Sequence, residues 1–302
     1  MRTRTKSVMP LVVFAVLMVS YSGPMVKGAL QAGATPVTIA FMRMFVSGLL
    51  LLPYELRQVK TQHMQFKVSR EQIGWILLAS LFLTGHYCTW ISSLKGTSTF
   101  ASVALVCTQP IFVALFSYIL FREKLPKKAF PGAILALLGS VIISLSAFVG
   151  GGDVTGAEFT SNLLALSGAV LMAAHWLASH YIRKSLSSSI YTPILYFVTA
   201  CFLGLLLPFN GGFVMPVEAL PYMAGLIIGS TLLGHAIFTY TISHVSASVI
   251  SFALLGEPVG AMVFSYFFFN EIPSGMVVLG GGLTLLGLWF YLFANAKTQP
   301  KV

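Results

Sequence analysis

The sequence predicts an all-α integral membrane protein, with ten transmembrane helices arranged as two inverted five-helix repeats. Three observations lead to this fold class. Of the 302 residues, 57% are hydrophobic and only 9% are charged, and the mean hydropathy of the chain is +0.87. The charges are bunched between apolar stretches of about 20 residues, the length that crosses the hydrocarbon core of a bilayer. Finally, the two halves of the chain resemble each other in sequence.

Each apolar stretch predicts one membrane helix, and short linkers separate the helices. The basic start of the chain could begin a secretory signal, but no small-residue cleavage site follows before Pro24 and Lys27, so we interpret this stretch as the first helix. The ten predicted helices are residues 8–29, 35–54, 73–94, 98–120, 129–148, 161–182, 190–208, 220–243, 246–269 and 273–294. The chain then divides into a first repeat at 1–148, an external linker at 149–160, a second repeat at 161–294 and a cytoplasmic tail at 295–302.

The positions of the basic residues predict the orientation. With the N-terminus inside, every Lys and Arg except Lys27, Lys95 and Arg43 falls in a cytoplasmic segment, as the positive-inside rule requires. We therefore expect a multi-pass protein of the cytoplasmic (cell) membrane with both termini in the cytoplasm. A protein that binds nucleic acid would carry its basic residues on a folded polar surface, so the net charge of +10 predicts no nucleic-acid partner. The lipid bilayer is the expected partner.

An internal repeat is the most specific signal in the chain. Residues 108–139 align without a gap to residues 256–287. Chance similarity between apolar helices rarely keeps a proline, an acid and two glycines in register. The matched positions are Pro110 and Pro258, 116–118 and 264–266, Glu123 and Glu271, Gly132 and Gly280, and Gly139 and Gly287.

The number of helices in each half determines how the halves are related. Five is odd, so the second half enters the membrane from the opposite side, which makes this an inverted-topology repeat. Such repeats suit a transporter whose halves rock around a central site and expose it to each side of the membrane in turn. The alternative is a duplicated membrane scaffold that carries nothing.

The same segments resemble the EamA-type ten-helix exporters of the drug/metabolite transporter superfamily, over nearly the whole chain. The resemblance implies a basket-shaped substrate cavity lined by the first four helices of each half, with the fifth helix of each half outside it. The residues that carry the resemblance are 101–123, Met42 with Arg43, and Gly256, Glu257 and Pro258 with Glu271.

The predicted fifth and tenth helices are rich in glycine, which lets helices approach closely in lipid. We expect these helices to be packing elements or the contact of a homodimer. No phosphate-cradling loop and no dinucleotide fingerprint is present, and Cys88, Cys107 and Cys201 lie in apolar segments without metal-ligand spacing, so neither a cofactor nor a metal site is predicted. The glycines of the predicted fifth and tenth helices are Gly132, Gly139, Gly280, Gly281, Gly282 and Gly287.

Two charged residues lie deep in predicted helices, where a charge costs about 2.5 to 3.5 kcal/mol. Glu257 is the acid, and we predict that it couples transport to protons or binds a cation. Pro258 beside it leaves backbone carbonyls available for ligands. Alternatively, Glu257 pairs with Arg43 or caps the freed backbone. Arg43 could hold a substrate carboxylate or could be an internal ion-pair partner.

Histidine and tryptophan side chains complete the predicted substrate cavity. His86, Trp90 and Ser93 recur at i, i+4 and i+7 on the third helix, so they share one face. There His could titrate near neutral pH and Trp could stack on a flat or cationic substrate. The alternative is that the histidines connect helix to helix. The other predicted cavity residues are His175, Trp176, His235 and Arg43.

Prolines inside membrane helices predict hinges, here at Pro24, Pro110 and Pro258.

The resulting hypothesis is a secondary transporter that exports a small organic metabolite, an amino acid or a related amphipathic compound, by alternating access that could be proton-coupled. A nucleotide-sugar or phosphate-ester exchanger of the same superfamily is the alternative, but it would favour several deep basic residues. A membrane enzyme acting on lipids would need catalytic clusters that the short loops do not offer, so no catalytic residue is predicted. A channel would need a ring of like polar groups.

Overall fold

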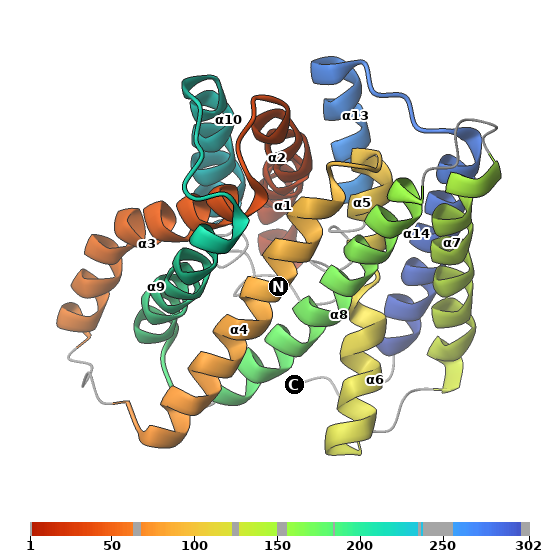
Figure 1. The fold of residues 1–302 in the computed structure, drawn as a ribbon. Helices are drawn as coiled ribbons and strands as arrows, with labels where there is room; N and C mark the ends of the chain where they lie inside the picture. The colour runs from red at the N-terminus through yellow and green to blue at the C-terminus, as the bar shows by residue number, and fades with distance from the viewer. Residues whose placement is uncertain are drawn as a thin grey trace.

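The computed structural model describes residues 2–62, 68–122, 127–149, 156–183, 185–234, 237 and 256–296, and its regular elements in these ranges are helices (Figure 1). Seven segments of the described chain are long and apolar enough to cross a membrane. They are Val13–Gln31, Pro36–Thr61, Arg70–Ser93, Thr99–Leu120, Ala157–Ser179, Ser189–Asn210 and Val217–Gly234. Glu257–Phe269 and Gly275–Tyr291 are shorter apolar helices.

The first half of the chain contains seven α-helices, because two of the predicted membrane helices are interrupted. The first predicted helix is divided at Tyr21, and the fourth is divided at Cys107 and Thr108. The elements are α1 (Arg2–Ser20), α2 (Ser22–Gln31), α3 (Pro36–Thr61), α4 (Arg70–Ser93), α5 (Thr99–Val106), α6 (Gln109–Phe121), η1 (Lys127–Ala129) and α7 (Phe130–Val149).

The second half combines α-helices with tighter and wider turns. Its predicted eighth helix, 220–243, begins as α10 and continues as a π-helical stretch, η4; residues 238–255, which include the start of the predicted ninth helix, lie outside the described residues. The elements are α8 (Ala157–Arg183), α9 (Ser188–Leu206), η2 (Leu207–Asn210), η3 (Val217–Ala219), α10 (Leu220–Ala224), η4 (Gly225–Gly234), α13 (Glu257–Phe269) and α14 (Gly275–Ala296).

Short polar residues determine where several helices begin. Before α4, the Ser69 hydroxyl accepts a hydrogen bond from the backbone N–H of Gln72 (3.2 Å), and the Gln72 side chain accepts one from the backbone N–H of Ser69 (2.8 Å). This capping box satisfies two N–H groups that the first helical turn leaves free. Ser98 caps α5 in the same way through Ala101. The caps thereby define the first residues of α4 and α5.

The sequence repeat extends to local backbone conformation. Helices α6 and α13 each have 13 residues, and each carries its proline, Pro110 or Pro258, in the first turn. Each ends at a residue in the left-handed conformation, Arg122 with φ 53° and Asn270 with φ 50°. All of these positions correspond in the register of the repeat. Pro110 and Pro258 therefore each lie in the first turn of a described helix, and the helix of Pro110 follows the interruption at Cys107 and Thr108.

Helices α7 and α14 pack so closely that a side chain at the facing glycines would meet the backbone of the other helix (Figure 1). A Cβ atom on Gly132 would lie 2.7 Å from the carbonyl oxygen of Gly287, and one on Gly139 would lie 2.5 Å from that of Gly280. Residue numbers rise along one helix as they fall along the other, so the two helices run antiparallel. Four of the six glycines that the sequence predicts as a packing or dimer contact, Gly132, Gly139, Gly280 and Gly287, are thus in contact within one chain. A homodimer through these helices stays a prediction, and it would have to use their outer faces.

Figure 1 shows α3 and α9 on one side of the molecule and α7 and α14 on the other, with α4 and α8 between them. Helices α4 and α8 are also antiparallel neighbours, because His86 of α4 contacts Gly168 of α8 while Ala79 contacts His175. The larger of the buried apolar clusters lies where α2, α3, α4, α9 and η4 meet. This cluster surrounds Arg43, a buried charged residue of the described chain.

Candidate functional site

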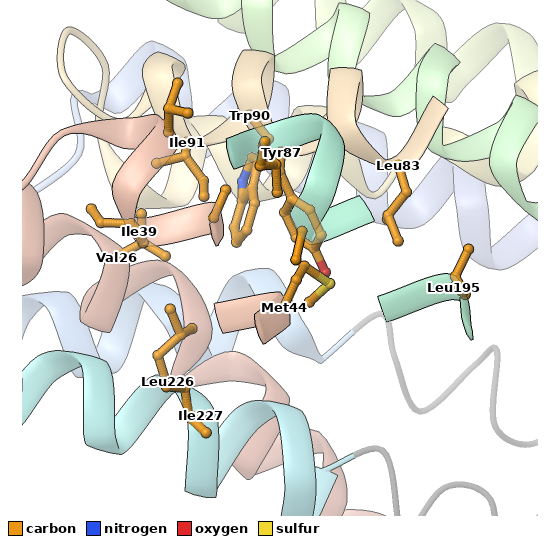
Figure 2. Close-up of a cluster of buried hydrophobic side chains, with 14 of the residues drawn as sticks. Val26, Ile39, Met44, Leu83, Tyr87, Trp90, Ile91, Leu195, Leu226 and Ile227 are labelled. Atoms are coloured by element: carbon orange, nitrogen blue, oxygen red, sulfur yellow. The ribbon is translucent and has the colours of Figure 1, made fainter. Parts of the chain in front are cut away.

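A cluster of buried apolar and aromatic side chains forms the surroundings of the candidate site. Figure 2 shows Tyr87 and Trp90 reaching from α4 into this cluster beside Met44 of α3. Val26 of α2 and Leu226 of η4 close it from other directions. A polar group placed here is removed from water, so its interactions must come from the protein or from a bound molecule.

Arg43 is the charged residue inside this region, and its side chain is only 5% exposed. Its Nε donates a hydrogen bond to the Thr231 hydroxyl of η4 (3.0 Å), and its Nη1 donates one to the Ser22 hydroxyl of α2 (3.3 Å). The guanidinium carbon lies 5.2 Å from the centre of the Tyr87 ring, which is a cation–π contact. Arg43 thus draws α2, α3, α4 and η4 together around one positive charge.

Glu257 stands in the first turn of α13, directly after Gly256. The helix N-terminus stabilises a negative charge there, while the alternative that Glu257 caps freed backbone stays a prediction. Arg43 is near enough for its charge to act on the Glu257 carboxylate, yet the two form no ion pair, since Lys27 with Glu271 is the salt bridge found in the described chain. The structure therefore does not show the direct Arg43–Glu257 pair, and the roles of the two residues stay predictions.

His86 is buried and connects α4 to α8. Its Nδ1 donates a hydrogen bond to the carbonyl oxygen of Gly168 (2.9 Å), and its ring stacks on Trp90 with 5.7 Å between ring centres and 11° between planes. The Trp90 indole N–H is buried and has no partner among the described residues. His86 thus makes the helix-to-helix contact that was the alternative to a cavity role, whereas Trp90 keeps a hydrogen-bond donor free.

His175 of α8 makes the corresponding contact to α4, also through a backbone carbonyl. Its Nδ1 donates to the carbonyl oxygen of Ala79 (2.9 Å), and its Nε2 lies 3.4 Å from the hydroxyl of Ser179, which is itself 2.6 Å from the hydroxyl of Tyr191. This chain of contacts joins α4, α8 and α9. Trp176 is different, because its side chain is 51% exposed and meets His175 edge-on. Its place in a cavity stays a prediction.

The remaining predicted residues are distributed along the same helices. Ser93 bonds the carbonyl oxygen of Trp90 (2.6 Å) and the hydroxyl of Ser102 (2.7 Å), so it ties α4 to α5. Pro24 is the third residue of α2, after the interruption at Tyr21. His235 lies outside the described residues. The structure thus brings Arg43, His86 and Trp90 into one buried region and leaves the hinge role of the prolines as a prediction.

Three residues at the site were not predicted from the sequence: Ser22, Tyr87 and Thr231. Thr231 lies 188 positions from Arg43, and neither hydroxyl belongs to a motif that marks it as a partner of a guanidinium. Tyr87 follows His86 directly but points to Arg43 instead of to Gly168. For Ser22 the sequence contains one indirect signal, because the nearby Pro24 predicted a hinge in this helix.

Comparison with solved structures shows the same fold in another protein. A crystal structure superposes on this chain with a TM-score of 0.63 at 18% identity, covering 96% of this chain and 98% of the other. At this identity the likeness concerns the fold alone.

Sequence comparison identifies relatives of the same length. The uncharacterized transporter YdfC of Bacillus subtilis (strain 168) is 26% identical over 280 residues, which cover 91% of this chain and 88% of YdfC. An uncharacterized transporter of Clostridium kluyveri is 22% identical over 280 residues, covering 90% and 87% of the two chains. The EamA-like transporter family matches twice, over residues 6–145 and 159–293. With one match in each half, the chain belongs to the EamA-like transporter family and is a multi-pass membrane transport protein.

Proposed function

We propose that this membrane transporter is a secondary transporter of the cytoplasmic membrane that exports a small organic metabolite by alternating access. Ten transmembrane helices form two inverted five-helix halves, with both termini in the cytoplasm. Seven of the predicted spans overlap segments long enough to cross a membrane, α7 and α14 overlap two more, and α13 overlaps the second half of the predicted span 246–269. The substrate is an amino acid or a related amphipathic compound, which the mixture of aromatic, hydroxyl and charged groups around Arg43 would suit.

The observation that carries this proposal is the matched pair of short helices, one in each half, that carry a proline in the first turn. Helices α6 and α13 begin and end at corresponding residues, next to Pro110 and Pro258. Short, proline-containing segments in corresponding positions of the two halves are typical of the binding region of inverted-repeat transporters, because the free backbone groups at helix ends can bind substrates and coupling ions. The antiparallel pairing of α7 with α14 supports the inverted orientation of the halves.

Glu257 is the proposed site of proton coupling. It is an acid within the membrane region of the described chain, it lacks an ion-pair partner there, and it lies in the first turn of α13. An acid that changes its protonation state as the halves rock would link the proton gradient to substrate movement. Gln109, at the corresponding position of α6, carries no charge, so the coupling is asymmetric between the halves.

Flux measurements in liposomes test the function and the coupling together. The full chain is reconstituted, metabolite fluxes are screened with and without an imposed pH gradient, and wild type is compared with Glu257→Gln. We expect the variant to lose pH-driven accumulation, by at least about tenfold, while exchange without a gradient persists. Glu218→Gln, which changes an acid outside the buried region, is the control and should behave as wild type. Unchanged pH-driven accumulation in Glu257→Gln would exclude the coupling role.

A further inference from the structure

The coordination of Arg43 is incomplete. A guanidinium has five N–H donors, and Arg43 uses Nε and Nη1 on the hydroxyls of Thr231 and Ser22. Within the described ranges, no carboxylate forms an ion pair with it. Its partners are therefore neutral, although the side chain is almost fully buried. A buried charge without a direct ion pair is unfavourable, and the two hydroxyl dipoles and the more distant Glu257 carboxylate reduce that cost without occupying the remaining N–H donors.

The contacts hold the guanidinium in one orientation. Thr231 accepts from Arg43 and in turn donates to the carbonyl oxygen of Leu226 (3.1 Å), five residues earlier in the π-helical stretch η4. Tyr87 covers one face of the guanidinium plane. An orientation fixed by neutral groups leaves the remaining N–H donors ready for a planar anion, with little reorganisation when it arrives.

Two unpartnered hydroxyl groups lie near Arg43 or next to its partner Thr231 in the sequence. Ser47 is 0% exposed and has no hydrogen-bond partner among the described residues. It stands one helical turn after Arg43 on α3, and side chains at i and i+4 are neighbours on a helix surface. Ser230, beside Thr231 in η4, is likewise buried without a partner in the described chain. A buried hydroxyl without a partner costs free energy that a polar ligand would recover.

The charge and shape of the site favour one class of anion. A guanidinium matches the two oxygens of a carboxylate in a bidentate pair. One positive charge balances one carboxylate, whereas a phosphate group with two negative charges would remain half compensated in the interior. The neighbouring Tyr87, Trp90 and Met44 side chains are aromatic or apolar and would accommodate a hydrophobic side chain.

We infer that Arg43 binds the carboxylate of the transported compound, with Ser22, Thr231 and Tyr87 holding its guanidinium in position. The inference rests on the proposed function and names the substrate class: a monocarboxylate that carries an apolar or aromatic side chain. Ser47 supplies a further hydrogen bond from the same face of α3. Arg43 is thus a substrate-binding residue rather than an internal ion-pair partner.

Compounds that differ only in the carboxylate test the inference. The probes are L-leucine and L-phenylalanine, the corresponding amides, and the amines isoamylamine and phenethylamine. For the full chain, thermal stabilisation in detergent and uptake into liposomes are measured for each. We expect the wild type to respond to the carboxylates and at least about tenfold less to the amides and amines, since the bidentate pair is lost. Amides that bind as well as the carboxylates would overturn the inference.

Variants assign the effect to Arg43. Arg43→Gln should lose the preference for carboxylates, and Arg43→Lys should keep the charge but weaken the response about tenfold, because an ammonium lacks the planar fork. Thr231→Val preserves size but removes the acceptor for Nε, so it should weaken carboxylate binding several-fold even if Arg43→Gln fails to fold. Arg57→Gln, on the exposed cytoplasmic end of α3, is the matched control and should behave as wild type.

The two hypotheses fail in different ways. If the wild type transports the carboxylates and Arg43→Gln and Thr231→Val transport them equally well, the carboxylate site is wrong and the transport function stands. If the wild type moves a neutral or cationic metabolite and excludes the carboxylates, the site is also wrong while secondary transport is retained. If the reconstituted wild type moves no metabolite with or without a gradient, the proposed function fails.

Discussion

His86 illustrates how a single polar residue in a membrane helix acquires its role from its neighbours. The sequence placed it on a face with Trp90 and Ser93, where it could titrate in a cavity. In the structure its Nδ1 proton is engaged by the Gly168 carbonyl, because a carbonyl oxygen can only accept. The ring is 3% exposed and stacks on Trp90. At this position the imidazole connects two antiparallel helices.

This role predicts different outcomes for two substitutions. His86→Asn places an amide N–H near the position of Nδ1, so it keeps the donor to Gly168 while removing the imidazole. We expect its pH profile of transport to match wild type. His86→Ala loses the hydrogen bond and leaves a cavity beside Trp90, which should lower the free energy of unfolding by about 2 to 4 kcal/mol. Thermal unfolding in detergent and pH-dependent flux measure the two effects. A flattened pH profile in His86→Asn would show that the imidazole titrates during transport.

At the scale of elements, the pairing of α7 and α14 depends on glycine at particular positions of each helix. A Cβ on Gly280 would lie 2.8 Å from the carbonyl oxygen of Gly139 and 3.0 Å from the backbone N of Ile143. Backbone atoms cannot move aside as a flexible side chain can, so the helices would have to separate. Gly282, two residues along α14, has no atom within 4 Å of such a Cβ.

The two positions form a matched pair for mutation. Gly280→Ala should lower the free energy of unfolding by about 1 to 3 kcal/mol, the usual cost of overpacking. Gly282→Ala should be neutral or should stabilise by about 0.5 to 1 kcal/mol, because alanine favours the helix and meets open space. Thermal unfolding of both variants in the same detergent measures the difference. Equal melting temperatures would mean that α7 and α14 are not closely packed in the membrane.

For the whole molecule, one of the contacts that join the two halves at one end of the helices is a cluster of Lys27, Thr99 and Glu271, which we call the clasp. Glu271 accepts hydrogen bonds from the Thr99 backbone N–H (2.5 Å) and the Thr99 hydroxyl (2.7 Å), and it lies 3.9 Å from the Lys27 ammonium group. Lys27 also donates to the carbonyl oxygen of Thr97 (3.0 Å). The clasp lies at the end that the basic residues predict to be external.

Opening of the external side would have to break the clasp. Its side chains are 17% exposed, so its net contribution is that of a partly screened pair with charge-assisted hydrogen bonds. Loss of about 1 to 3 kcal/mol would change the ratio of closed to open molecules by roughly 5- to 150-fold. Glu271→Ala should therefore broaden the distance between spin labels at Gln31 of the first half and Ile272 of the second half toward longer values. Glu218→Gln, an acid outside the clasp, is the control, and an unchanged distribution in Glu271→Ala would exclude a gating role.

Much of the fold was predictable because hydropathy and the repeat are properties of consecutive residues. The spans near Pro36–Thr61 and Arg70–Ser93, the glycine contact and the correspondence of Pro110 with Pro258 all follow from patterns of that kind. The partners of Arg43 do not, because Ser22 and Thr231 come together only when distant helices pack. The rotation of each helix decides whether His86 faces a neighbour or a cavity, and amphipathic periodicity is weak in helices that are apolar on every side.

The glycine contact between α7 and α14 has a consequence for the origin of the chain. Gly132 meets Gly287 while Gly139 meets Gly280, and the repeat relates Gly132 to Gly280 and Gly139 to Gly287. Such a reciprocal contact is that of two identical subunits about a two-fold axis. An ancestral gene for one half could have produced a subunit that inserted in both orientations and dimerised through this face. Duplication and fusion would then have fixed one copy in each orientation, so that ancestral assembly no longer depended on the chance of insertion.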